Sequence, residues 1–134
     1  MARTLPLYAT PHAQAATKII DWKFGMSATE QKQTVEVNAD VIFKWIGHHN
    51  VYMFPNKADF DDCDFTKATL LAMSTQNSYT FKTSSPGVFY FGCEVGGHCT
   101  YLQQKLALTV TGSVTFSNAL LCPKAQCVDM SILF

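Results

Sequence analysis

The sequence has 134 residues, of which 48% are hydrophobic and ten are phenylalanines, and its ten basic side chains balance its ten acidic ones. A chain of this length forms about one domain that can bury roughly two thirds of its unfolded surface, so the composition predicts a compact globule. Zero net charge leaves no basic surplus to neutralise phosphates, which argues against binding to nucleic acid or to a membrane surface. No run reaches the ~20 apolar residues of a membrane span, so we expect no transmembrane segment.

Residues 1–16 predict an irregular arm with two prolines and without the continuous apolar segment of a signal peptide. An Ala-Gln-Ala run there resembles a cleavage site, so the arm fits either the remnant of a leader or an added expression segment. We expect one domain at residues 17–111, followed by a C-terminal extension at residues 112–134.

Hydrophobic residues alternate along several short stretches, as they do in half-buried β-strands. The clearest case has Val41, Phe43 and Trp45 on one face. The stretch at 68–73 fits a strand or a short helix, and we favour a strand because its neighbours are β. In chain order, the expected strands cover residues 18–22, 34–37, 41–46, 68–73, 79–82, 88–93 and 106–111. Seven or eight short strands with regular turns and no long helical period predict an all-β fold, a Greek-key β-sandwich.

An acidic segment separates two of these strands and contains four aspartates between Asp59 and Asp64. Counted as a calcium-binding loop from Asp59, it has Asp64 where a glycine is needed and Leu70 where a bidentate glutamate is needed. The segment therefore predicts a solvated acidic loop rather than a site for a hard cation.

Five cysteines are many for a small cytosolic protein, because reducing compartments do not preserve disulfides. They are Cys63, Cys93, Cys99, Cys122 and Cys127. If four of them pair in an oxidising compartment, one thiol is left over, and binding a metal as a thiolate is a reason for it to stay unpaired. The spacing of Cys122 and Cys127 can close a small loop and is not the Cys-x-x-Cys of oxidoreductases, which favours a structural disulfide. The cysteines therefore predict an extracytosolic location.

A cysteine and two histidines are predicted to meet at one end of the sheet. Cys93 ends one strand, His98 follows five residues later in a glycine-lined loop, and His49 ends an earlier strand. Two imidazoles and one thiolate, with a weak fourth donor such as Met or Gln, describe a type 1 (blue) copper site. Adjacent strand residues face opposite sides of a sheet, so His48 and His49 are not expected to point to the same site.

These residues belong to a longer pattern. It comprises His49-Asn50-Val51, Cys63 in the acidic segment, the run Tyr-Phe-x-Cys-x-Val-x-Gly-His-Cys at 90–99, and a Gln-Lys pair before the last strand. Over residues 17–111 the sequence resembles the phytocyanins among the cupredoxins, and the glutamine makes it look most like their stellacyanin subgroup. The resemblance implies a cupredoxin-like fold and a disulfide between Cys63 and Cys99, with Cys122 and Cys127 forming a second bridge outside the match.

The resemblance also implies the metal and its ligands. They are one copper ion held by His49, Cys93 and His98, and the asparagine that follows His49 selects it over His48. Cys93 is then the odd thiol that the cysteine count left unpaired.

Two glutamines compete for the axial position beside the copper. The family pattern gives Gln103 when it is counted as five residues after the loop histidine, and Gln104 when it is counted as the residue before the lysine. Gln104 shares its phase with the core-facing Leu106, whereas Gln103 shares its phase with Lys105. Gln104 requires one extra loop residue, and Gln103 requires a bulge after it. We favour Gln104 and keep Gln103 as the alternative.

The resemblance implies a monomeric blue copper protein that carries single electrons between transient redox partners, either proteins or small molecules, at an exposed edge of His98. The alternative is a cupredoxin-fold structural or binding module whose metal site is not used for electron transfer. An enzyme acting on copper-bound oxygen is disfavoured, because the donor set is closed and the sequence has no second histidine cluster.

Overall fold

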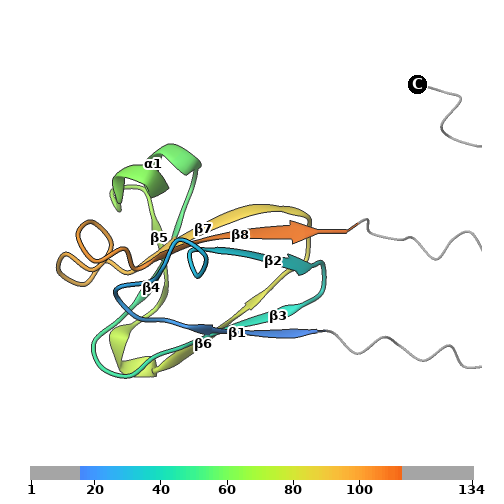
Figure 1. Cartoon of the computed structure of the whole chain (residues 1–134), viewed down its shortest axis with the longest axis horizontal. Coiled ribbons are helices and arrows are strands. Elements are labelled where there is room, and N and C mark those ends of the chain that lie inside the picture. The colour runs from blue at the N-terminus through green and yellow to red at the C-terminus, as the bar shows by residue number, and fades with distance from the viewer. Residues whose placement is uncertain (1–15, 113–134) are drawn as a thin grey trace, which may run out of the picture.

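The computed structural model describes residues 16–112, which form eight strands, one short α-helix and one 3-10 turn (Figure 1). The predicted arm and the extension that contains Cys122 and Cys127 fall outside these residues. No helix in the described part of the chain is long and apolar enough to cross a membrane. In chain order the elements are β1 (Thr17–Asp21), β2 (Lys32–Glu36), β3 (Asp40–Lys44), β4 (Val51–Phe54), α1 (Lys57–Asp62), β5 (Thr69–Ala72), η1 (Ser74–Gln76), β6 (Ser78–Lys82), β7 (Gly87–Gly92) and β8 (Lys105–Thr111).

The strands form two mixed sheets. The smaller sheet has the order β1-β3-β6, and the larger has the order β2-β8-β7-β4-β5. Two pairs, β1 with β3 and β2 with β8, are parallel, and the remaining pairs are antiparallel. The strands β2 and β3 are consecutive in the chain but lie in different sheets. The turn between them, which contains Asn38 at φ 72°, connects one sheet to the other. This arrangement confirms the prediction of an all-β protein with about eight strands.

The main core lies between the two sheets. Val41 and Phe43 of β3 are fully buried, as the alternation predicted, and so are Leu106 and Leu108 of β8. Phe43 packs across the core against Phe91 of β7, with the ring centroids 5.0 Å apart. A packed core on both sides leaves the strand ends little freedom to move, so loops that leave these ends start from fixed positions.

A second, smaller core lies between α1 and the other face of the larger sheet, and α1 projects beyond the sandwich in Figure 1. Phe60 of α1 packs on Tyr90, with centroids 5.0 Å apart. The predicted loop was wrong in part: residues 57–62 form a helix, because Asn56 caps it by accepting a hydrogen bond from the Asp59 amide. Asp61, Asp62 and Asp64 are exposed to solvent, as predicted. Aspartate in a first turn also favours a helix through the helix dipole.

The strand that was expected at 41–46 is shorter than predicted. β3 ends at Lys44, and Gly47, at φ 89°, turns the chain away from the sheet. His49 therefore lies in the connection to β4 rather than at the end of a strand. Alternation did not predict β4, because its first and last residues, Val51 and Phe54, are both buried. Residues three apart on a strand point to opposite faces, so this strand buries side chains on both faces.

Candidate metal centre

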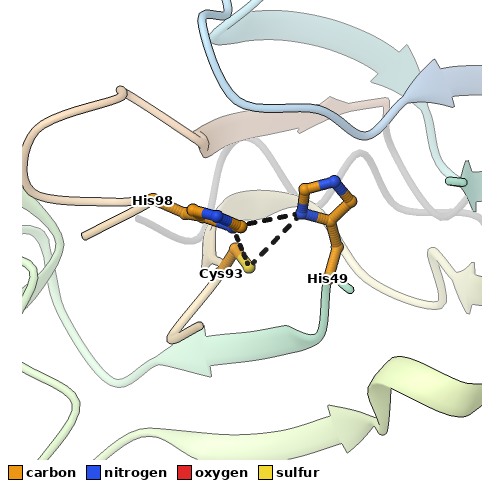
Figure 2. Close-up of side chains that lie close together, drawn as sticks. All are labelled: His49, Cys93 and His98. Carbon is orange, nitrogen blue, oxygen red and sulfur yellow. Dashed lines mark hydrogen bonds between the residues drawn. The ribbon is translucent and has the colours of Figure 1, made fainter. Parts of the chain in front are cut away.

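Three parts of the chain bring a cysteine and two histidines together at one end of the sandwich. Cys93 directly follows β7, His98 lies in the loop between β7 and β8, and His49 precedes β4. This loop is at the left of Figure 1, at the opposite end from the start of β1 and the end of β8. Figure 2 shows that the three side chains point toward a common centre.

Each histidine turns its Nδ1 atom toward the other two donors. The two Nδ1 atoms are 3.2 Å apart, and Cys93 Sγ is 3.6 Å from Nδ1 of His98 and 4.0 Å from Nδ1 of His49. A point equidistant from the three atoms lies about 2.1 Å from each, which matches the ~2.0 to 2.3 Å bonds of a first-row metal such as zinc to histidine nitrogen and cysteine sulfur. The three donors thus fit a single metal ion without rearrangement.

Asn50 links the segment of His49 to that of Cys93. Its side-chain oxygen accepts a hydrogen bond of 2.8 Å from the Glu94 amide, and its side-chain nitrogen donates to the Glu94 carboxylate at 3.3 Å. Its backbone carbonyl accepts from the indole N–H of Trp22, a buried residue, at 2.9 Å. The separation between His49 and Cys93 is therefore held by hydrogen bonds that do not involve the donor atoms themselves.

Burial disfavours the charged form of two of the donors. Burial raises the pKa of the Cys93 thiol, and the hydrogen bonds that it accepts from the Asn50 and Val95 amides only partly oppose this. Burial, and next the proximity of His98, lowers the pKa of His49, so its ring is held neutral. A neutral imidazole is the form that binds metals, whereas the thiol becomes a good ligand only once a cation stabilises its thiolate.

Gln104 is the candidate for a fourth donor. It is 0% exposed, and neither amide atom has a hydrogen-bond partner among the described residues. Its amide is close enough to His49 to oppose the lowering of that pKa, although it makes no hydrogen bond of standard geometry. Buried polar atoms are normally paired, so the unpaired amide near His49 makes Gln104 a candidate for the fourth donor. Gln103, by contrast, is exposed and occupies the left-handed region at φ 56°.

The loop that carries His98 is fastened to α1. A disulfide joins Cys99 to Cys63, which ends α1 in the left-handed conformation, and this is the pairing that the resemblance implied. Lys105 donates hydrogen bonds of 3.1 Å to the last carbonyls of α1, at Phe60 and Asp61. The residue next to His98 is thereby tied covalently to a second element of the fold.

Phe24 also lies at the centre, although the sequence pattern did not indicate it. Its ring centroid is 5.3 Å from that of His98 and 5.9 Å from that of His49. It comes from the connection between β1 and β2, far from the other site residues in the chain, so no local spacing could have placed it there. His48, in contrast, is exposed and does not join the cluster.

No family model and no curated protein matches the sequence. The structure is similar to cucumber stellacyanin with Cu2+, at a TM-score of 0.60 and 24% identity over 75% of this chain and 99% of that one. It is also similar to spinach plantacyanin, at 0.57 and 26% over 72% and 100%, and to cucumber basic protein, a blue copper protein, at 0.59 and 22% over 72% and 100%.

These similarities define the fold as that of a cupredoxin. Among the cupredoxins it is phytocyanin-like, as the sequence pattern predicted. The cluster of His49, Cys93 and His98 is consistent with one type 1 copper site in such a fold.

Proposed function

We propose that this protein is a blue copper protein that carries single electrons between redox partners. The observation that supports this best is the triangle of two imidazole Nδ1 atoms and one thiol, with edges of 3.2, 3.6 and 4.0 Å, in a fold similar to that of blue copper proteins. In this proposal His49, Cys93 and His98 would hold the copper ion, and Gln104 would supply a weaker fourth donor. Copper bound there supplies a one-electron couple between Cu(I) and Cu(II).

The residues around the site suit this role because they resist movement. Cu(I) and Cu(II) prefer different coordination, so a donor set that holds one compromise arrangement lowers the rearrangement that each transfer requires. Asn50 fixes the spacing of His49 and Cys93, and the Cys63–Cys99 disulfide restrains the neighbour of His98. With its four donors filled, the site has no open position for a substrate, which supports a carrier rather than an enzyme.

His98 is the proposed route for electrons. Cys93 is 0% exposed and His49 only 6%, whereas His98 is half-buried and follows two glycines that add no side-chain bulk. A partner that docks over His98 comes closer to the metal than it could elsewhere. Docking through a small patch fits the brief encounters of redox proteins. The disulfide supports an extracytosolic location, where such bonds persist.

A copper titration tests the proposal. Adding Cu(II) to the metal-free chain should produce an intense visible absorption from thiolate-to-copper charge transfer, saturating at one equivalent of copper. Cys93→Ser should remove this absorption, while Thr100→Ser, a similarly small change in the same loop, should keep it. A folded protein that remains colourless with copper would instead support the structural or binding module.

A further inference from the structure

Phe24 lies against both imidazoles of the proposed copper site while 52% of its own surface stays exposed. The centroid distances of 5.3 and 5.9 Å both fall in the range of packed aromatic pairs, about 4.5 to 7 Å. The ring planes are tilted by 46° to that of His98 and 59° to that of His49. A single ring thus contacts two separate donors from the solvent side of the site.

The position of Phe24 does not follow from burial in the core. The residues that anchor this segment to the core are its neighbours Trp22, 1% exposed, and Met26, 4% exposed. Between them, the Gly25 amide donates a hydrogen bond to the carbonyl of Leu102, in the loop that carries His98. The backbone on both sides of Phe24 is therefore fixed against the site, and the ring between these anchors can reach the two histidines.

Polar contacts on the outer side of the segment hold it in the same place. Ser27 and Glu30 cap each other, with the Ser27 amide 2.7 Å from the carboxylate and the Glu30 amide 3.2 Å from the hydroxyl. Lys23 bridges Glu30 and Asp21 at 3.1 and 3.2 Å. The hydrogen bond from the Ser27 amide, and next that from Lys23, lowers the pKa of Glu30 to about 2, so its carboxylate stays ionised in acid that would protonate an ordinary glutamate. Exposed pairs of this kind stabilise the fold little, but together they favour one conformation of the segment.

We propose that Phe24 is a cover for the metal centre, which limits the access of water and dissolved reagents to the two imidazoles and to Cys93. The ring occupies space that solvent would otherwise fill beside the two imidazoles that contact Cys93 Sγ. An apolar cover also keeps the surroundings of the donors poorly solvated, which strengthens electrostatic interactions inside the site. The inference takes the identity of the metal from the proposed function, but the shielding of Cys93 does not depend on a bound metal.

Two rates in the full-length chain test the cover. The first is alkylation of Cys93 by iodoacetamide in the metal-free protein, followed by mass spectrometry of the peptide that contains Cys93. The second is the removal of Cu(II) from the copper-loaded protein by an excess of EDTA. Phe24→Ala should accelerate both by about tenfold or more, because a reagent would no longer need the cover to open before it reaches the site.

Matched variants separate the cover from a general effect of losing an exposed apolar side chain. Ile19→Ala removes a side chain of similar exposure, 56%, from β1 and should leave both rates unchanged. Phe24→Trp should preserve slow alkylation. If Phe24→Ala folds poorly, Phe24→Leu replaces it in the test; this variant keeps part of the apolar bulk and should give intermediate rates.

The outcomes distinguish this proposal from the proposed function. Wild-type rates in a folded Phe24→Ala variant, with copper bound and blue, would overturn the cover and leave the function intact. Faster alkylation of Cys93 in Phe24→Ala, together with a wild-type protein that takes up no copper, would support the cover and overturn the function. Equal acceleration in Ile19→Ala would show a general loosening and would also overturn the cover.

Discussion

The Nδ1 atom of His49 lies 3.2 Å from the Nδ1 atom of His98, although 49 positions separate the two histidines in the chain. Two protonated imidazoles at this distance would repel each other, and the burial of His49 already disfavours its charged form. The metal-free protein therefore holds His49 neutral under conditions in which an unfolded chain would protonate it.

This relationship predicts that acid destabilises the metal-free protein. The pKa of His49 is lowered on folding from about 6.5, so the unfolded state binds the proton more readily. The stability that comes from holding His49 neutral is fully present above about pH 6.5, and it is lost as the pH falls toward the pKa of His49 in the folded protein. Urea unfolding at a series of pH values should show this loss starting just below about pH 6.5, above the range in which carboxylates such as Glu30 titrate. His49→Asn should flatten this part of the profile, and a stability that rises on acidification would contradict the assignment.

Gln104→Met should raise the reduction potential of the copper-loaded protein, because a thioether is a softer donor than an amide oxygen and favours Cu(I). In the metal-free protein the same change removes two buried polar atoms without partners, so the free energy of unfolding should increase by about 1 to 3 kcal/mol. Gln103→Met, at the exposed neighbouring position, is the control and should leave the potential unchanged in voltammetry. A potential that rises in Gln103→Met but not in Gln104→Met would assign the axial role to Gln103. An unchanged potential in both variants would exclude both glutamines as the axial ligand.

Removing the disulfide should weaken both the fold and the metal site. Cys63 and Cys99 are 36 positions apart, and a closed loop of this length contributes about 2 to 4 kcal/mol by restricting the unfolded chain. The double variant with serine at both positions, so that neither residue leaves a thiol to mispair with Cys93, should lose about that much in chemical denaturation and release copper to EDTA faster. A loss of stability with no change in copper release would show that the disulfide does not restrain His98.

Gly92→Ala should destabilise the protein by about 1 to 3 kcal/mol through overpacking. A methyl group there would lie 2.6 Å from Cε2 of Phe54 and 3.2 Å from Cζ of Phe65, both in the packed region beneath α1. Thermal unfolding of the metal-free protein measures the loss. Gly96→Ala, which faces open space but has φ 50°, tests backbone strain without crowding. No loss in Gly92→Ala would contradict the prediction and would show that the rings of Phe54 and Phe65 move to make room for the methyl group.

Much of the site could be predicted because its signals are local. Cys93 and His98 are five residues apart in one loop, and the alternation that buries Leu106 and Leu108 continues back to Gln104 without interruption. Side chains two apart on a strand share a face whatever the rest of the fold does, so this register follows from the order of the residues alone.

The features that were missed depend on contacts between distant segments. β4 has no alternating pattern, because the sheet neighbours on its two sides and the core decide what it buries. The helix at Lys57–Asp62 was obscured by its acidic residues, although Asn56 was a usable capping signal. Phe24 reaches the histidines only through the packing of Trp22 and Met26, which a linear pattern does not contain.

The parallel pairing of β2 with β8 also determines when the protein can acquire its metal. β2 is among the first strands to be synthesised, but its neighbour in the sheet, β8, is the last of the described strands. The loop with His98 and Gln104 closes only when β8 enters between β2 and β7. A nascent chain therefore has no completed donor set until β8 has emerged from the ribosome, so a metal that uses all of these donors binds after synthesis of the described strands.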